Sequence, residues 1–202
     1  MLKNRERANL AALQAKEEAV KAKEDLERAF ERLQNNETKI RELMLTDSLT
    51  GLANRRFLDE RLADEIERLK RYGNRLSLIM TDLDYFKQIN DAHGHVFGDE
   101  ILIEFAKILK EDLRPMDFAA RFGGEEFLII LPETSIESAN IIAVRIREKL
   151  LKTKLTKTDK PVTASFGVTE IHTRDSARDA FLRVDKALYQ SKENGRDQIT
   201  VF

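Results

Sequence analysis

The sequence contains few of the residues that cross-link or interrupt a chain. Cysteine is absent, which excludes disulfide bonds and thiolate metal sites and fits a reducing compartment. No apolar run approaches the length that crosses a bilayer, and the N-terminal residues include no apolar signal core. The net charge of -1 gives no case for a general nucleic-acid or anionic-membrane surface. We therefore expect a soluble, cytoplasmic protein without nucleic-acid or membrane contacts.

Glycine and proline are absent from the N-terminal stretch. The first glycine of the chain is Gly51, and the first proline is Pro115. Residues 1–45 are instead rich in Ala, Glu, Lys, Arg and Leu, which favour helices. An imperfect heptad spacing, with Glu37 counted in the register, relates Leu26, Phe30, Leu33, Ile40 and Met44. This spacing predicts a coiled coil, and a single solvated helix stabilised by Glu–Lys pairs is the alternative. We expect a helical stalk over residues 1–45 and a compact domain over residues 46–202.

The compact domain alternates between helical and strand-like patterns. Asn54 is placed to cap a helix that ends at Gly73, and Thr134 with Glu137 forms a capping-box pattern at another helix start. Apolar runs and alternation predict strands over residues 76–81, 118–122, 127–131 and 162–169, and a closing strand after residues 194–195. Helical periodicity marks residues 86–92, 99–113 and 180–188. A hairpin inside an alternating pattern predicts an α+β fold, with a central mixed or antiparallel sheet flanked by helices.

The segment Gly123-Gly124-Glu125-Glu126 joins two of these expected strands. Paired glycines supply the positive φ that primed hairpin turns require. Two carboxylates at such a tip, beside backbone amides unobstructed by Cβ atoms, suit a metal-bound polyphosphate. The alternative is a solvated acidic turn, which is common on protein surfaces.

A further acidic position follows the strand expected over residues 76–81. Asp82 stands where that strand runs into a helix start, and it would lie beside Glu125 if the two strands were neighbours. The pair would then supply the oxygen ligands that Mg²⁺ prefers. For Asp82 taken alone, a helix N-cap is the alternative.

Polar residues farther along fit the recognition of a guanine nucleotide. Asn90 and Asp99 flank a tight loop that contains glycine, and an amide with a carboxylate can pair with the Watson–Crick edge of guanine. Lys192 and Arg196 lie four residues apart around a turn and suit phosphates. The alternatives are a polar turn with Asp99 as a helix cap, and a solvated basic helix end.

Taken together, these motifs resemble the GGDEF domain of diguanylate cyclases, which has a palm-like nucleotidyl-cyclase fold. The resemblance spans residues 45–202. It rests on residues 47–56, 82–87, 94–99, 121–127 and 187–196, and on Asn90. Ala53 stands where the family often has proline, and Glu125 stands where the family name has aspartate, a change that keeps the carboxylate.

The resemblance implies that the domain condenses two GTP into cyclic di-GMP and releases two pyrophosphates. Asp82, Glu125 and the Leu83 carbonyl would bind Mg²⁺, for which Mn²⁺ substitutes. Glu126 would help to activate the attacking 3′-hydroxyl. Guanine would be recognised by Asn90 and Asp99. The phosphates would be held by the amides around Tyr85 and Phe86, and by Lys87, Lys192 and Arg196, with Lys192 also serving catalysis.

The resemblance also implies regulation and a homodimer. Each domain would hold one GTP, so two domains must face one another, and the coiled coil would bring them together. Residues 114–117 resemble the family's RxxD inhibitory site, where Arg114 and Asp117 would bind cyclic di-GMP and Arg145 or Arg147 would reach in from another domain. The rival hypotheses are a catalytically silent cyclic di-GMP receptor and a pure coiled-coil interaction protein. The complete set of acidic and basic residues favours the enzyme over the silent receptor, and the motifs of the compact domain oppose a pure coiled-coil protein.

Overall fold

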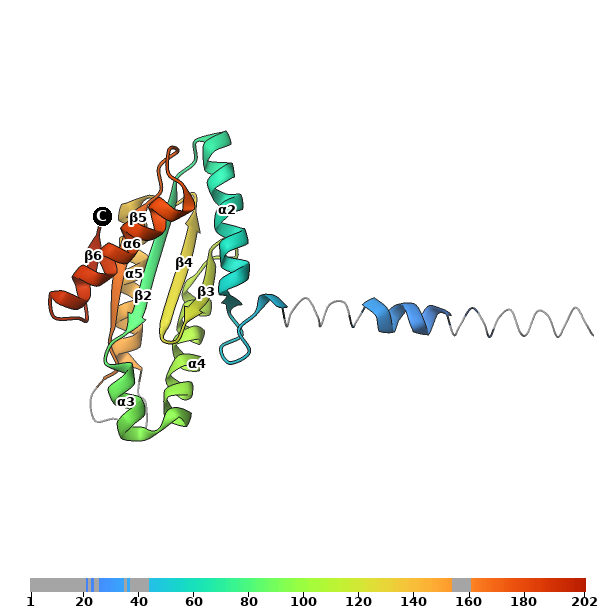
Figure 1. The fold of residues 1–202 in the computed structure, drawn as a ribbon, viewed down its shortest axis with the longest axis horizontal. Helices are drawn as coiled ribbons and strands as arrows, with labels where there is room; N and C mark the ends of the chain where they lie inside the picture. The colour runs from blue at the N-terminus through green and yellow to red at the C-terminus, as the bar shows by residue number, and fades with distance from the viewer. Residues whose placement is uncertain (1–20, 22, 24–25, 35, 37–43, 154–160) are drawn as a thin grey trace, which may run out of the picture. The chain divides into compact units, whose positions relative to one another are not determined.

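The computed structural model describes residues 21, 23, 26–34, 36, 44–153 and 161–202 (Figure 1). The chain divides into two compact units, Met1–Met44 and Leu45–Phe202, and each is described by itself.

In the first unit, residues 26–34 are helical. Leu26, Phe30 and Leu33 are 71%, 58% and 65% exposed, respectively. An exposed apolar stripe at heptad spacing is what one helix offers to a partner helix. Ile40 lies outside the described residues, as do Ala12 and Ala19, which continue the same register toward the N-terminus, so the coiled coil stays a prediction.

The second unit alternates strands and helices in the predicted order (Figure 1). Its strands are β1 (Ala53–Asn54), β2 (Leu76–Leu83), β3 (Phe118–Gly123), β4 (Glu126–Pro132), β5 (Ala164–Glu170) and β6 (Ile199–Val201). Its helices are α2 (Arg55–Tyr72), α3 (Phe86–His93), α4 (His95–Asp112), α5 (Ile136–Lys152) and α6 (Ala177–Glu193). As predicted, the Asn54 side chain caps α2 by accepting from the Phe57 amide, and Gly73 ends it in a left-handed conformation. The sequence did not predict β1, because two residues are too few to show a period.

The six strands form one mixed sheet in the order β1-β3-β4-β2-β5-β6. At its centre, β2 runs antiparallel to both β4 and β5. The edge strands β1 and β6 pair in parallel with β3 and β5, respectively. Every residue of β2 is buried, so both faces of the central strand are covered. The predicted mixed sheet flanked by helices is confirmed.

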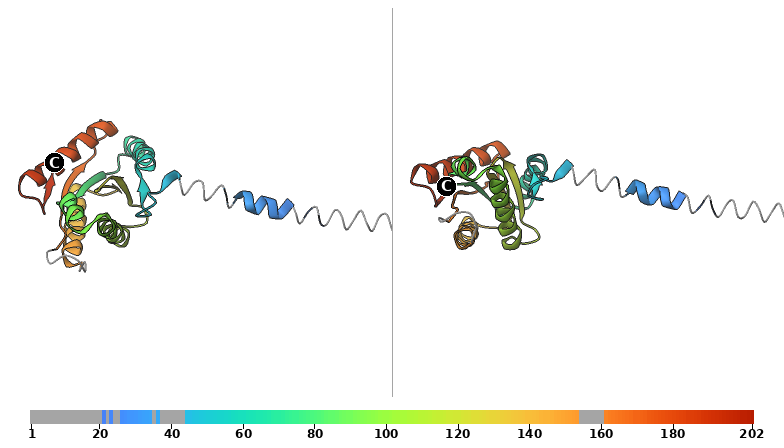
Figure 2. Two further views of the ribbon diagram at one scale, coloured as in Figure 1. Left: turned by 60° about the horizontal axis from the view of Figure 1, so that its bottom comes forward. Right: turned by 90° about the horizontal axis from the view of Figure 1, so that it is seen from below.

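Helices cover both faces of this sheet (Figure 2). On one face lie α4 and α5, and Phe105 of α4 meets Phe127 of β4 edge to face at 5.0 Å between ring centroids. On the other face lie α2 and α6, which share a buried cluster with β2. A Cβ at Gly167 of β5 would collide with the α6 backbone at Leu188, so this glycine lets the helix approach the sheet closely. The end of α6 is thereby fixed near the central strands.

One local expectation was wrong. The first residue of the Thr134–Glu137 pattern does not cap α5, because its hydroxyl is buried and donates to the Pro132 carbonyl. Ser135 caps that helix instead, accepting from the Ser138 amide. A capping box does occur, but at the start of α6.

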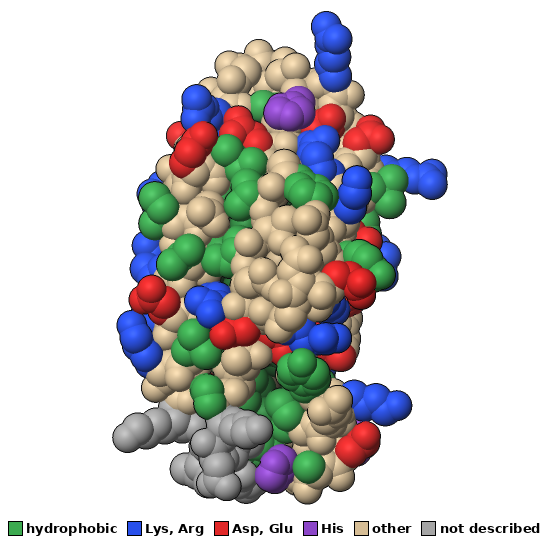
Figure 3. All heavy atoms as spheres, turned by 90° about the vertical axis from the view of Figure 1, so that its left-hand side faces the viewer, with side chains coloured by type: hydrophobic (Ala, Val, Ile, Leu, Met, Phe, Trp, Pro, Cys, Tyr) green, Lys and Arg blue, Asp and Glu red, His purple; other side chains and the backbone are tan. Residues whose placement is uncertain are grey.

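Charged side chains of both signs are interspersed over the described part of the face that Figure 3 shows. Such mixing does not produce the single-sign field that attracts a polyanion to a surface. No helix among the described residues is long and apolar enough to span a bilayer.

Candidate active site

The acidic hairpin joins β3 to β4 at one end of the sheet. Gly123 pairs with Glu126, which leaves Gly124 and Glu125 in the turn. Only one of the two glycines, Gly124, has a positive φ, at 54°. The pair thus supplies the positive φ expected of the turn through Gly124. The register shifts between Arg121 and Gly123, the kind of irregularity that redirects a strand end.

The central strand brings another carboxylate to this hairpin. Asp82 of β2 is the register partner of Glu126 of β4, and the Leu83 amide donates to the Glu125 carbonyl at 3.3 Å. The two strands are therefore neighbours, which is the condition on which the pairing of Asp82 with Glu125 rested. Backbone hydrogen bonds alone set this juxtaposition.

Asp82 is buried beside a cation. Its side chain is 10% exposed, and its Oδ2 lies 2.7 Å from Nζ of Lys192 on α6. Burial raises the pKa of Asp82 to about 6, against the lowering effect of the Lys192 hydrogen bond and charge, and the charges of Glu125 and Glu126 raise it further. Asp82 lies within β2, and Tyr85 is the N-cap of α3, so the N-cap alternative for Asp82 is wrong.

The donor set at this end of the sheet fits Mg²⁺. The described residues form no group of three or more His, Cys, Asp or Glu side chains arranged to hold a metal. Mg²⁺ in nucleotide sites is bound by one or two carboxylates together with substrate phosphates, so a complete protein cage is not required. The burial and like charge that disfavour an ionised Asp82 are both relieved by a bound cation.

The two residues expected to recognise guanine lie at the corner where α3 meets α4. Asn90 is in α3, and Asp99 is inside α4, which begins at His95, so the helix-cap alternative for Asp99 is wrong. A Cβ at Gly98 would collide with Oδ1 of Asn90, and this glycine therefore makes room for the amide. That Oδ1 is buried and has no hydrogen-bond partner in the described part of the chain. It is an acceptor that a ligand N–H group would satisfy.

The residues expected at the phosphates lie around the start of α3. Tyr85 has a left-handed backbone, with φ 56°, and precedes Phe86, the first residue of α3. The guanidinium of Arg196 lies 4.8 Å from the centroid of the Tyr85 ring. Lys87 is exposed on the first turn of α3. Arg196 therefore lies beside the start of α3, where backbone amides favour anions.

The expected inhibitory residues occupy the turn between α4 and β3. The Arg114 amide donates to Oδ2 of Asp117 at 2.9 Å, and the Asp117 Oδ1 is buried without a partner in the described part of the chain. Burial raises the pKa of Asp117, although the Arg114 amide and the charges of Arg114 and Arg145 oppose the shift. Arg145 of the same chain thus lies near this turn, bonded to Asp112. Arg147 is bonded to Asp197.

Sequence reasoning missed the contacts by which the Arg121 side chain holds the hairpin tip. Nε of Arg121 donates to the Gly124 carbonyl at 2.9 Å, and its Nη1 lies 3.3 Å from both carboxylate oxygens of Asp47. Asp47 also accepts from the amide and the hydroxyl of Thr50. The segment that opens the compact domain is thereby tied to the acidic turn. A partnership across 74 positions leaves no local period that would reveal it.

With this geometry in hand, comparison with known proteins defines the class. The family model described as "Diguanylate cyclase, GGDEF domain" matches residues 44–198, and the chain therefore belongs to the GGDEF domain family. The predicted family is confirmed.

Two relatives show the extent of the similarity. The chain is 42% identical to Diguanylate cyclase DgcP of Pseudomonas aeruginosa over 163 residues, which are 80% of this chain and 24% of that protein. It is 38% identical to Response regulator PleD of Caulobacter vibrioides over 185 residues, which are 89% of this chain and 41% of that protein. The chain thus spans less than half the length of these curated relatives.

Solved structures confirm the fold. The coiled coil and GGDEF domain of DgcB from Caulobacter crescentus, in complex with c-di-GMP, superposes with a TM-score of 0.83 at 31% identity, covering 88% of this chain and 96% of that one. The active GGEEF domain of a diguanylate cyclase from Vibrio cholerae gives a TM-score of 0.72 at 36% identity, covering 75% and 97%.

Proposed function

We propose that residues 46–202 form a diguanylate cyclase domain, which condenses two GTP molecules into cyclic di-GMP and releases two pyrophosphates. The observation that carries the proposal is the placement of Asp82 beside the Glu125–Glu126 hairpin, with Lys192 2.7 Å away. Acidic groups for a metal and a cation for phosphates meet at one end of the sheet. Membership of the GGDEF family, and relatives named as diguanylate cyclases, support this reaction.

The acidic end would hold the metal and receive the proton. Asp82, Glu125 and the Leu83 carbonyl would bind Mg²⁺, or Mn²⁺ in its place, together with the phosphates of the nucleotide. When bound, the metal neutralises charge that develops as a 3′-oxygen attacks an α-phosphorus in line. Glu126, half-buried next to Asp82 on the neighbouring strand, would accept the proton of the attacking hydroxyl.

Guanine and phosphates would be held by separate elements. The Asn90 amide and the Asp99 carboxylate would pair with the base at the α3–α4 corner. The amides around Tyr85 and Phe86, with the side chains of Lys87, Lys192 and Arg196, would hold the β- and γ-phosphates. Lys192 and Arg196 would also stabilise the negative charge of the departing pyrophosphate.

Each domain would supply one GTP, so the product forms where two domains face one another. We assign residues 1–45 to a coiled coil that holds the homodimer. The exposed apolar stripe of Leu26, Phe30 and Leu33 supports this assignment, as does the likeness to a structure that comprises a coiled coil and a GGDEF domain. A dimer raises the effective concentration of each active half for the other.

The enzyme assignment is tested by incubating the full chain with GTP and Mg²⁺ and separating the products by chromatography. We expect cyclic di-GMP and pyrophosphate, and we expect neither from Glu125→Ala. Glu148→Ala, which removes an exposed carboxylate of α5, is the control and should retain full activity. A chain that binds cyclic di-GMP but never forms it would establish the silent receptor instead.

Feedback inhibition is the second part of the proposal, with Arg114 and Asp117 as the primary contacts and Arg145 as the third. Arg114→Ala should raise the concentration of cyclic di-GMP that halves the rate by about tenfold or more, since a bidentate guanine contact contributes about 1–3 kcal/mol. Arg178→Ala, exposed on α6, is the control. An inhibition constant that Arg114→Ala leaves unchanged would contradict this assignment.

A further inference from the structure

The turn that carries Arg196 has an unusual backbone. Arg196 and Asp197 are consecutive left-handed residues, with φ values of 66° and 47°. Residues with a Cβ adopt this conformation at a steric cost, and two in succession persist only where surrounding contacts determine them. This turn is held by contacts from α5, from Asp84 just after β2, and from α6, where the Ser191 carbonyl accepts from the Arg196 amide at 3.0 Å.

Arg147 of α5 makes three hydrogen bonds to Asp197. Its Nε donates to the Asp197 carbonyl and to Oδ1, both at 2.8 Å, and its Nη2 donates to Oδ2 at 2.9 Å. The two side chains are 28% and 34% exposed. A planar guanidinium on a carboxylate fixes orientation as well as distance, so the Asp197 backbone is held together with its side chain.

From the end of β2, Asp84 holds the same residue. The Asp197 amide donates to Oδ2 of Asp84 at 3.0 Å. The hydroxyls of Thr163 and Ser165 donate to the Asp84 carboxylate, each at 2.7 Å. Asp84 is 3% exposed, and both of its oxygens accept hydrogen bonds, so it is a fixed point of the domain.

The neighbouring residue on each side of this link belongs to the proposed phosphate site. Tyr85 follows Asp84, Arg196 precedes Asp197, and the Arg196 guanidinium lies 4.8 Å from the Tyr85 ring. The bond between Asp84 and Asp197 therefore sets where Arg196 lies relative to the start of α3. Asp84 accepts from the Asp197 amide, while Arg147 donates to the Asp197 carbonyl and carboxylate, so the two residues hold different groups of Asp197.

We propose that Arg147 is a positioning residue for the nucleotide triphosphate: by holding Asp197 against Asp84, it directs Arg196 toward the β- and γ-phosphates. The inference rests on the proposed function, because it needs a triphosphate in the site. Arg147 acts only through Arg196, and the guanine-binding corner of α3 and α4 does not depend on it. Loss of Arg147 therefore weakens the grip on the phosphates and spares the grip on the base.

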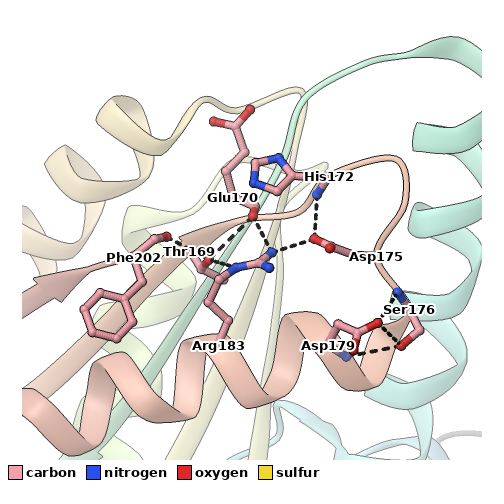
Figure 4. A network of polar contacts seen from close by, with 8 residues as sticks. All are labelled: Thr169, Glu170, His172, Asp175, Ser176, Asp179, Arg183 and Phe202. Atoms are coloured by element: carbon pink, nitrogen blue, oxygen red, sulfur yellow. Dashed lines mark hydrogen bonds and ion pairs between the residues drawn. The ribbon is translucent and has the colours of Figure 1, made fainter.

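Arg183 of α6 is a matched control, because it makes the same kind of contact toward the opposite end of the sheet. Figure 4 shows Arg183 with its partners Thr169, Glu170 and Asp175. Its Nε donates to Oγ1 of Thr169 at 2.7 Å, and its Nη2 donates to the Glu170 carbonyl at 2.8 Å and to Oδ2 of Asp175 at 2.6 Å. Its side chain is 27% exposed, almost as for Arg147. Glu170 pairs near the first residues of β2, away from the carboxylates of the site. Arg183→Gln thus removes a comparable bracket without touching Arg196.

The test is equilibrium binding of two probes, 3′-deoxy-GTP with Mg²⁺, which lacks the attacking hydroxyl, and GMP, to the full chain. Arg147→Gln should weaken the binding of 3′-deoxy-GTP by about tenfold, which is the scale of one charge-assisted phosphate contact. It should weaken the binding of GMP by less than about twofold. Arg147→Lys keeps the charge but lacks the planar guanidinium, so its affinity for 3′-deoxy-GTP should lie between those of Arg147→Gln and wild type. Arg183→Gln should leave both affinities within about twofold, even where its Tm falls as far as that of Arg147→Gln.

A double variant separates positioning from a general loss of structure. Arg147→Gln combined with Arg196→Ala should bind 3′-deoxy-GTP no more weakly than Arg196→Ala alone, because Arg147 acts through Arg196. The inference would be overturned if Arg147→Gln lost the same factor of affinity for both probes. It would also be overturned if the losses of 3′-deoxy-GTP affinity were additive in the double variant. The variants could change 3′-deoxy-GTP binding as expected while the wild-type chain makes no cyclic di-GMP from GTP. That result would refute the proposed reaction and support the positioning role of Arg147. A wild-type chain that binds neither probe would overturn both.

Discussion

The two ends of the candidate site are built in different ways. At the acidic end, Asp82 and Glu126 are register partners on adjacent strands, so the backbone ladder sets their spacing. At the basic end, Arg196 lies on a left-handed turn that the side chains of Arg147 and Asp84 hold. A ladder survives the loss of one side chain, whereas the Arg196 turn, in which one backbone bond to the Ser191 carbonyl remains, should shift when Arg147 or Asp84 is lost. A variant at the acidic end should remove a reacting group and leave the surrounding backbone unchanged. A variant of a residue that supports the Arg196 turn should displace Arg196.

The largest effect is expected at the strand-borne end. Asp82→Ala should lower the rate of cyclic di-GMP formation by about a thousandfold or more, because a metal ligand stabilises transition-state charge by several kcal/mol. Circular dichroism should show an unchanged fold, since the ladder remains. Asp59→Ala, exposed on α2, is the control. A residual rate above about one tenth of wild type would place the metal elsewhere.

A smaller effect is expected at the turn-borne end. Arg196→Ala should cost about 10- to 100-fold in kcat/KM for GTP, mainly through KM, because one charge-assisted contact contributes about 1.5–3 kcal/mol. Steady-state kinetics measure this split, with Arg174→Ala in the exposed loop after β5 as the control. A change confined to kcat would show that Arg196 acts in chemistry and not in binding the ground state.

The hairpin tip is an intermediate case, since a strand pair and a side-chain bracket both hold it. Arg121→Gln should lower kcat about five- to tenfold with little change in KM, because a displaced tip misaligns the reacting groups. Asp47→Asn should have a smaller effect, since Arg121 keeps its bond to the Gly124 carbonyl. The double variant should be no worse than Arg121→Gln alone, and additive losses would mean that the two side chains act separately.

The last predicted effect is on stability and not on rate, and it depends on pH. Asp82 has a pKa of about 6 in the fold against an ordinary value of 3.8. A carboxyl group whose pKa is raised by folding contributes its full stability below the unfolded pKa and loses it as pH rises through the folded pKa. Between about pH 4 and about pH 7.5 without metal, the unfolding free energy of wild type should fall by up to about 3 kcal/mol relative to Asp82→Asn. Urea denaturation measures this difference, and a constant difference across that range would contradict it.

Local patterns predicted most of the fold and the acidic end of the site. Apolar periods marked the strands that carry Asp82 and Glu126, and the two caps of α2 followed from residue type. The placement of Asp82 beside the hairpin still required the strand order, which alternation predicted only as a mixed sheet. The pattern at Thr134 misled because Ser135, the next residue, has the same capping chemistry.

The basic end was less predictable, because its supports are distant in sequence. Asp84 and Asp197 are 113 positions apart, and Arg147 and Asp197 are 50 apart. A buried carboxylate with several partners looks in sequence like any other aspartate after a strand. Arg147 was considered only for the inhibitory site, since its helical position does not reveal which face meets the Arg196 turn.

The requirement that two domains face one another is tested most directly by the order of the reaction in protein concentration. A fragment comprising residues 46–202 should form cyclic di-GMP at an initial rate that rises with the square of its concentration at low concentration, because two separate domains must meet. We expect the N-terminal helix to hold the full chain as a dimer, so its rate should be proportional to concentration over the same range. A fragment whose rate stays strictly proportional to concentration, with the same specific activity as the full chain, would contradict both the facing of two domains and the role of that helix.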